Sequence, residues 1–403
     1  MKNLYHYILE NFDDSLKLSD DDKKRLIELD EKFNKLADIY EKEHIHFANI
    51  TNMDDAIDSV LKAVKDKNTA FKLHLKYEKS NIGNDKWCND FIDKINRLKI
   101  DFIDLNCYVT KFYIYRINKI IEQIMFLNQY TKDNKSTAKV KNYPSVRLYN
   151  EAIKLIKENP YIDKDELIKK DDDYKQIYTP EESQKILQKE IDKYGYGWKV
   201  VIDKYMVPRM SVRPYREFRI NANNKFSKVD LESLKVHEVA VHVARKYNAL
   251  QSGLYLFIHG LKGNNVYDEG LAIYNSLNKV KKPKPNILFY ICMKIILLYH
   301  MHSSNIVDSF NFIKKLTNID DRKIALAIVR ASRIYIYTPL GNYSTDEDYL
   351  DGYLRVKDMS EEDRQKLLEF PIGPDQLFEL DTIKKFIKIN KFDPIKINND
   401  DNE

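Results

Sequence analysis

The chain has 403 residues, of which 43% are hydrophobic and 32% charged, a balance that excludes both a disordered chain and a membrane bundle. The net charge of +5, from 67 basic and 62 acidic residues, is too small to predict a dedicated nucleic-acid surface. Only 10 glycines and 11 prolines favour helices over a loop-rich β fold, and 3 widely spaced cysteines argue against disulfides and for the cytoplasm.

The first 130 residues predict a layer of amphipathic helices. One helix is expected around 20–48, capped by Ser19, because apolar residues recur there at steps of three and four. A second long helix is expected at 89–131. Its inner face would carry Phe91, Ile95, Leu98, Phe102, Leu105, Val109 and Phe112. We interpret region 1–135 as a structural helical bundle or hairpin, with a partner-binding arm as the alternative.

The composition of the chain changes at 131–145. This segment is polar, weakly periodic and closed by Pro144, so it is expected to link the helical layer to a second region at 145–395. Within that region, a helix is expected to begin at Thr179, because this capping residue is followed by a proline and two glutamates.

Two short strands and a buried helix complete the expected fold. The segments 198–203 and 216–221 alternate or run apolar as strands do. The apolar run at 286–301 is too short for a membrane span and contains Lys294, which predicts a buried helix and no membrane segment. The fold class is therefore mainly α with a small β-sheet (α+β).

One segment carries residues that point to chemistry: His237-Glu238-Val-Ala-Val-His242, inside a helix expected from Ser227 to about Tyr247. Zinc-peptidase helices usually space two histidines four apart, so that both imidazoles share a face. Five steps along a regular α-helix leave the two side chains about 140° apart, whereas a π-type turn brings them within about 50°. A metal site therefore requires a widened helix here. The alternative is a regular helix with one histidine in the core.

A third ligand is expected from the sequence DEGLA at 268–272, where Glu269 follows His242 by 27 residues. Catalytic zinc takes three protein ligands and leaves one position open for water. The set would be His237, His242 and Glu269, with Glu238 as the general base. The glycine of this segment would let two backbones approach closely. The alternative for Glu269 is an ordinary acid at a helix N-terminus.

HEVAVH followed by DEGLA resembles the microtubule-associated tyrosine carboxypeptidase family and its bacterial relatives, which carry HExxxH and then [QE]EGLA. The resemblance covers roughly 145–360. It includes the segments RMSVRPYREFRIN and RASRIYIYTPLGNYSTDEDYLDGYL, with Arg213, Arg330, Arg333, Tyr349 and Gly352 in place. It implies a zincin-like metallopeptidase domain with an N-terminal helical layer.

The resemblance also implies an activity, that of a zinc-dependent carboxypeptidase removing a C-terminal Tyr or Phe from a peptide or protein. His237, His242 and Glu269 would bind Zn²⁺, and Glu238 would be the base for a metal-activated water. Arginine is the best donor for the substrate's free carboxylate. The candidates are Arg213, Arg330 and Arg333. Asp268 stands where the family usually has Gln or Glu, outside the inferred ligand set.

Two other functions stay open at this point: a zinc endopeptidase or toxin-like protease, and a regulatory binding protein on the same fold with little catalysis. Glu238 argues against the second, because a binding module needs no base. His259, between the two motifs, is expected to be a core residue, with oxyanion stabilisation as the alternative. The expected partner is a peptide or protein C-terminus, with no nucleic acid and no membrane.

Overall fold

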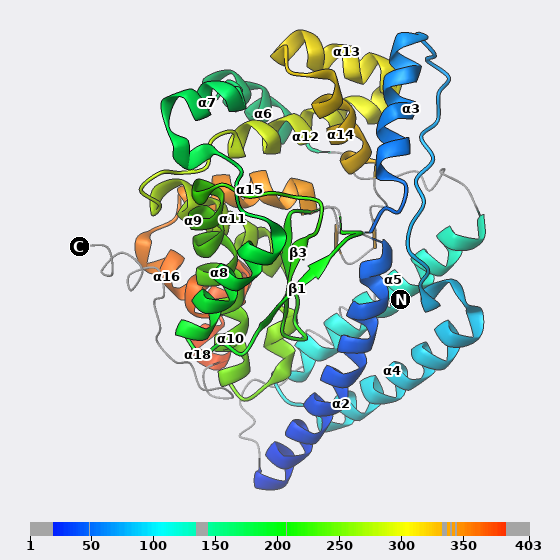
Figure 1. Cartoon of the computed structure of the whole chain (residues 1–403). Helices are drawn as coiled ribbons and strands as arrows, with labels where there is room; N and C mark the ends of the chain where they lie inside the picture. Colours follow the sequence, from blue (N-terminus) through cyan, green and yellow to red (C-terminus); the bar gives the residue numbers. More distant parts are fainter. Residues whose placement is uncertain are drawn as a thin grey trace.

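Helices dominate the structure, and a small three-stranded sheet lies among them, as the composition predicted (Figure 1). The computed structural model describes residues 19–47, 49–133, 144–206, 208–332, 337–338, 341–342 and 345–383. Within these ranges no helix has both the length and the apolar character needed to cross a bilayer.

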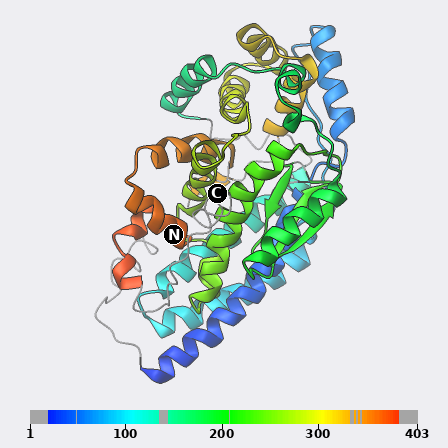
Figure 2. The ribbon, with the colours of Figure 1, turned by 60° about the vertical axis from the view of Figure 1, so that its left-hand side comes forward.

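Three long helices form the N-terminal layer: α2 (Asp20–His44), α4 (Asp85–Leu105) and α5 (Thr110–Asp133). They lie along one edge of the molecule, and α4 packs against both others (Figures 1 and 2). The Ser19 hydroxyl accepts a hydrogen bond from the backbone N–H of Asp22, so the predicted cap of α2 is confirmed.

The single helix expected at 89–131 is wrong, because the chain turns back between α4 and α5. Asn106 ends α4 with a φ of 45°, in the left-handed region that asparagine tolerates better than most residues. The hydroxyl of Thr110 then donates to the carbonyl of Cys107 at the start of α5. The result is a helical hairpin. The residues predicted on the inner face are nevertheless confirmed as core residues: Phe91, Ile95, Leu98, Phe102, Leu105 and Val109 are buried, and Phe112 is partly buried against them.

One hydrophobic core joins this layer to the rest of the chain. Its buried members include Phe33, Phe102, Phe218, Val239 and Phe370, from both sides of the expected linker. The linker itself falls largely on residues 134–143, which lie outside the described residues. The division into 1–135 and 145–395 therefore stays a prediction.

A second core lies at the end of the molecule opposite the N-terminus of α2 (Figures 1 and 2). It is built from α3 (Met53–Lys65), α6 (Val146–Glu158), α12 (Ile287–Ser303), α13 (Ile306–Thr317) and α14 (Asp321–Ala331). The predicted buried helix at 286–301 is confirmed as α12, which contributes Phe289, Cys292 and Ile296 to this core.

The sheet has the order β1-β3-β2, with β1 (Lys199–Asp203) parallel to β3 (Glu217–Asn221) and β2 (Met210–Val212) antiparallel to it. The two predicted strands are confirmed, whereas the three-residue β2 was missed. Helix α8 (Pro180–Lys193) packs against β1 and begins at the predicted Thr179 cap. The edge strand β2 packs against the helix that carries His237 and His242.

That helix is continuous through three segments: α9 (Lys228–Leu234), the π-helix η4 (Lys235–Val243) and α10 (Ala244–Gln251). It is followed by the 3-10 turn η5 (Tyr255–His259) and by α11 (Asn264–Asn278), which packs against both η4 and α15 (Thr345–Lys357). The remaining elements are η1 (Ile45–Phe47), η2 (Asn81–Gly83), α7 (Lys164–Lys170), η3 (Asp172–Tyr174), β4 (Tyr337–Thr338), β5 (Gly341–Asn342), α16 (Glu361–Glu369), α17 (Pro374–Leu377) and α18 (Leu380–Ile383).

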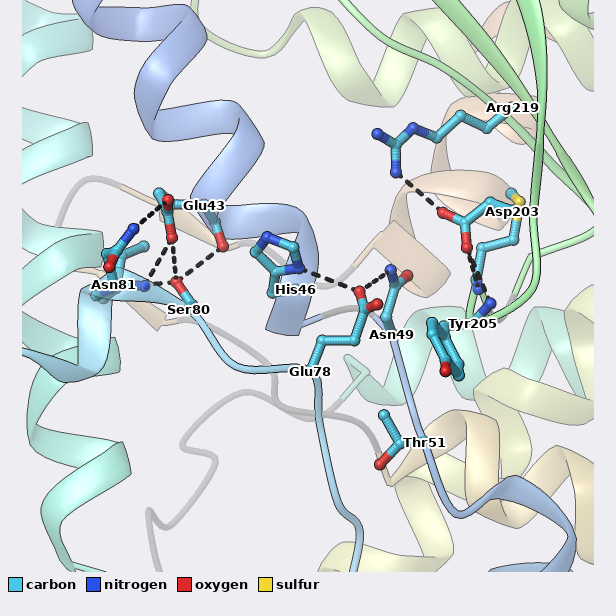
Figure 3. A network of polar contacts seen from close by, with 12 residues as sticks. Glu43, His46, Asn49, Thr51, Glu78, Ser80, Asn81, Asp203, Tyr205 and Arg219 are labelled. Atoms are coloured by element: carbon cyan, nitrogen blue, oxygen red, sulfur yellow. Dashed lines mark hydrogen bonds and ion pairs between the residues drawn. The ribbon is translucent and has the colours of Figure 1, made fainter.

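A polar network fastens the connection between α3 and α4 to the C-terminal end of α2 (Figure 3). The carboxylate of Glu43 accepts hydrogen bonds from the Ser80 hydroxyl at 3.0 Å and from the Asn81 backbone N–H at 2.7 Å. His46 Nδ1 lies 3.1 Å from Glu78 Oε2. His46 thus helps to hold the segment that leads into α4 against the end of α2 (Figure 3).

Candidate active site

The two motif histidines lie on the π-helical segment η4. Its wider turn brings both imidazoles to one face, with the ring centroids of His237 and His242 5.1 Å apart. The widened helix that a metal site requires at this spacing is therefore confirmed. Such segments concentrate at functional sites.

The start of this helix is fixed by Asp230. The Asp230 carboxylate accepts from the backbone N–H of Ser227, and the Ser227 hydroxyl accepts from that of Asp230, both at 3.0 Å, as a capping box. Arg209 donates to both carboxylate oxygens at 2.8 and 3.0 Å, and Lys284 Nζ lies 3.1 Å from Oδ1. Burial alone would raise the pKa of Asp230, but the charges of Lys284 and Arg209 hold that pKa well below its usual range.

Glu269, from α11, faces both histidines. Its Oε2 atom lies 3.7 Å from His237 Nε2 and 3.7 Å from His242 Nε2. This oxygen is buried and has no hydrogen-bond partner among the described residues. Two donor atoms bound to one tetrahedral zinc ion are about 3.4 Å apart, so each of these nitrogens lies close to ligand spacing from the Glu269 oxygen and too far from it for a hydrogen bond.

The other nitrogen of each imidazole is held by a polar partner. His242 Nδ1 lies 2.9 Å from Asp268 Oδ2. His237 Nδ1 lies 3.4 Å from the Ser276 oxygen, whose own hydroxyl donates to the Ala272 carbonyl at 2.7 Å. Both contacts favour a proton on Nδ1, so Nε2 is the nitrogen of each ring that a metal ion would bind, in place of any proton there. The residues present therefore fit a divalent ion such as zinc.

Glu238 is the second buried carboxylate beside the histidines. Its ligand atom and those of His237 and His242 all lie within 4.8 Å of one another. Burial raises the pKa of Glu238, and the neighbouring anions Glu269 and Asp268 raise it further against the opposing charges of the histidines. Burial also acts to raise the pKa of Glu269, but the charge of His242 outweighs it and lowers that pKa to about 2. The two glutamates thus differ in proton affinity at one site.

The glycine of DEGLA lies where two helices touch. A Cβ atom on Gly270 would be 2.4 Å from the carbonyl carbon and oxygen of Gly352 in α15. A Cβ atom on Gly352 would be 1.9 Å from the carbonyl oxygen of Val266. The predicted close backbone approach is confirmed, and it seats α15 directly against the helix that carries Glu269.

The three arginines predicted to bind the substrate come from two separate parts of the chain, and no hydrogen bond or ion pair between them and the motif histidines is seen among the described residues. Arg213 follows β2, and its Nε atom is buried without a hydrogen-bond partner among the described residues. Arg330 lies in the last turn of α14, where its charge contributes to lowering the pKa of Lys284, after the larger effect of burial. Arg333 lies outside the described residues. The substrate-binding role of these arginines stays a prediction.

Sequence reasoning assigned no role to Asp268, Arg245 or Ser276, although each supports the motif histidines directly or through another residue. Asp268 was singled out only as a departure from the family pattern. Arg245 follows His242 by three residues and so shares its helix face, which is the one signal that could have suggested it. His259 is a core residue, as expected, with Nε2 3.1 Å from Asn34 Oδ1.

Comparison with known proteins agrees with the motif resemblance. The model of the family described as microtubule-associated tyrosine carboxypeptidase matches residues 87–388, most of the chain, including the HEVAVH and DEGLA segments. The match begins within α4, so it also takes in part of the N-terminal layer. A search of curated proteins gave no match. The chain therefore belongs to the microtubule-associated tyrosine carboxypeptidase family, a family of peptidases.

Proposed function

We propose that the chain is a zinc-dependent carboxypeptidase that removes a C-terminal aromatic residue, Tyr or Phe, from a peptide or protein. The position of Glu269 Oε2, 3.7 Å from both His237 Nε2 and His242 Nε2 and so close to ligand spacing from each, carries the proposal. These three residues would hold the ion. Bound zinc would supply a Lewis acid that polarises the scissile carbonyl and lowers the pKa of the attacking water.

The opposite pKa shifts of the two glutamates support separate roles. Against the effect of burial, a positively charged His242 lowers the pKa of Glu269 to about 2, and a cation bound between the two residues would likewise keep Glu269 ionised, as a ligand must be. Glu238, with its pKa raised, is suited to take a proton from the attacking water and deliver it to the leaving amine. In this assignment Glu238 is the general base and does not bind the metal.

Exopeptidase action also requires a cation for the substrate's terminal carboxylate. The buried Nε of Arg213, which has no partner within the described part of the chain, supports this residue as a donor. Arg330 and Arg333 complete the proposed set on the resemblance of their segment to the family. The preference for Tyr rests on the family description, and Phe is included because it shares the aromatic ring. A free peptide or protein C-terminus in the cytoplasm is the implied partner.

The test is mass spectrometry of a peptide library, half with free and half with amidated C-termini. We expect loss of single aromatic residues from free termini only, abolished by a chelator. Glu238→Gln should lower turnover by about 100-fold or more. Glu232→Gln, an exposed glutamate paired with Lys235 on the same helix, is the matched control and should stay active. Internal cuts would instead identify an endopeptidase, and no cleavage by zinc-loaded protein would favour a binding role.

Metal content tests the ligand assignment separately. Glu269→Ala should lose stoichiometric zinc and the thermal stability that zinc binding adds, whereas Glu238→Gln should keep both. Stoichiometric zinc retained by Glu269→Ala, measured by atomic emission, would show that another residue is the third ligand.

A further inference from the structure

The carboxylate of Asp268, directly before Glu269, has both oxygens engaged. Oδ2 lies 2.9 Å from His242 Nδ1, and Oδ1 accepts a hydrogen bond from Arg245 Nη1. The Asp268 side chain is only 15% exposed, and that of Arg245 is completely buried. One carboxylate thus connects a buried guanidinium to an imidazole whose opposite nitrogen faces Glu269.

Arg245 is itself fixed by a distant part of the chain. Its Nε donates to the carbonyl of Leu367 at 2.7 Å, and its Nη2 donates to the carbonyl of Phe370 at 3.1 Å. A guanidinium is planar, so donors on several of its nitrogens fix its orientation as well as its position. The segment 367–372, which runs from the last turn of α16 toward α17, therefore determines the direction from which Arg245 meets Asp268.

The same segment and the adjacent Gly373 also contact the residues directly before α11, the helix that carries Asp268 and Glu269. The backbone N–H of Leu261 donates to the carbonyl of Pro371 at 3.4 Å. A Cβ atom on Gly373 would lie 2.4 Å from the carbonyl oxygen of Lys262. The segment is thus seated both on Arg245 and on the chain that leads into α11.

We propose that Asp268 and Arg245 are positioning residues for His242, and that through them the segment 367–372 supports the metal site. This inference rests on the proposed metal-binding function. A carboxylate bonded to Nδ1 holds a metal-binding imidazole in one tautomer and orientation and increases its basicity, and losing such a partner typically weakens metal binding 10–100-fold. Arg245 acts one step further away, by holding Asp268.

The protein offers a matched control for Asp268. Asp203, in β1, is 14% exposed and accepts a hydrogen bond from Arg219 at 2.9 Å, but its other partners are backbone N–H groups, such as that of Tyr205, and no histidine (Figure 3). Asp203→Asn therefore removes a comparably buried, arginine-paired charge away from the metal site. A purely structural role for Asp268 predicts the same behaviour for both variants.

The experiment measures the zinc dissociation constant of the full chain by competition with a chromophoric chelator. We expect Asp268→Asn to raise it 10–100-fold and Asp203→Asn to leave it unchanged while lowering the unfolding midpoint. The visible spectrum of the Co²⁺-loaded protein should change in Asp268→Asn and not in Asp203→Asn. An unchanged zinc dissociation constant in folded Asp268→Asn would overturn the proposal.

A double-mutant cycle tests whether Arg245 acts through Asp268. Arg245→Lys keeps the charge but loses the carbonyl contacts, and it should weaken zinc binding in the wild-type background. It should add little in the Asp268→Asn background. Additive losses of zinc affinity would show that Arg245 does not act through Asp268. A wild-type zinc affinity in Arg245→Lys would also overturn the proposal. This variant decides the question if Asp268→Asn does not fold. If the wild-type chain binds no zinc, the proposed function itself fails, which the first titration shows separately.

Discussion

Asp230, at the start of the helix that carries His237 and His242, and Asp30, in α2, are both buried carboxylates. Each accepts backbone N–H groups at the start of a helical segment. Their partners differ. Asp230 is bonded by Arg209 and Lys284, whereas Asp30 accepts from the Tyr113 hydroxyl at 2.7 Å and from the N–H groups of Tyr255 and Leu256, the first residues of η5.

The difference in partners reverses the effect of burial. Burial raises the pKa of both carboxyls, but cations reverse the shift in Asp230, whereas the hydrogen bonds to neutral donors only oppose it in Asp30, whose pKa is raised to about 6. At the start of the helix that carries His237 and His242, the negative charge of Asp230 is therefore balanced by Arg209 and Lys284. The contact between α2 and η5 depends instead on the Asp30 carboxyl, which is protonated at a higher pH than an ordinary aspartate.

Removing the charge of Asp230 should have the largest effect. Asp230→Asn leaves Arg209 and Lys284 together without their anion, and we expect a loss of about 3–5 kcal/mol in the free energy of unfolding at pH 7. Urea denaturation measures it. The control is Asp163→Asn at the exposed cap of α7, which should cost almost nothing because asparagine caps a helix equally well. A loss below about 1 kcal/mol in Asp230→Asn would contradict this account of balanced charge.

Acid titration tests the sign of the Asp230 shift. Its pKa in the folded chain is lowered from the ordinary value of 3.8, so its contribution is complete above that value. The contribution is lost as the pH falls below about 4, because protons then bind the unfolded chain preferentially. In Asp230→Asn this part of the acid destabilisation should disappear.

The opposite dependence is expected for Asp30. Its pKa rises from 3.8 in the ordinary carboxyl to about 6 in the folded chain. Between pH of about 4 and 6 the folded state holds a proton that the unfolded state has lost, so the free energy of unfolding falls as pH rises, by about 3 kcal/mol in total. Above pH about 6 the contribution is constant. Asp30→Asn should remove this slope in a series of urea melts, and a slope unchanged in that variant would assign it to another group.

The smallest effect is expected for Tyr113→Phe. The variant loses one hydrogen bond to Asp30, worth about 1 kcal/mol. Because the hydroxyl lowers the pKa of Asp30, its loss should move the midpoint of the pH dependence upward. Tyr108→Phe, whose hydroxyl bonds Glu379, is the control and should leave the midpoint in place. A downward shift in Tyr113→Phe would show that the hydroxyl does not stabilise the ionised carboxylate.

Much of the local structure could be predicted from the sequence, because it depends on residues a few positions apart. The caps at Ser19, Thr179 and Ser227 are set by side chains that reach the N–H group three residues ahead. The five-residue spacing of His237 and His242 likewise required a widened turn before any fold was known, and η4 provides it.

Where local signals were weak or ambiguous, prediction failed. The apolar periodicity of α4 continues across Asn106 into α5 closely enough to suggest one helix, and only packing of the second arm against the first decides the turn. The strand β2 has three residues, too few for an alternating pattern, and exists because β3 offers it a partner.

The sequence by itself determined the mainly helical character, several helix caps and which residues are candidate metal ligands, since periodicity, capping and residue type act within a few positions of the chain. The tertiary structure alone decided which groups support those ligands. Arg245 meets carbonyls that lie 122 and 125 residues further along, and Gly270 meets Gly352 across two helices. Such contacts depend on how distant segments pack together, which no local pattern encodes.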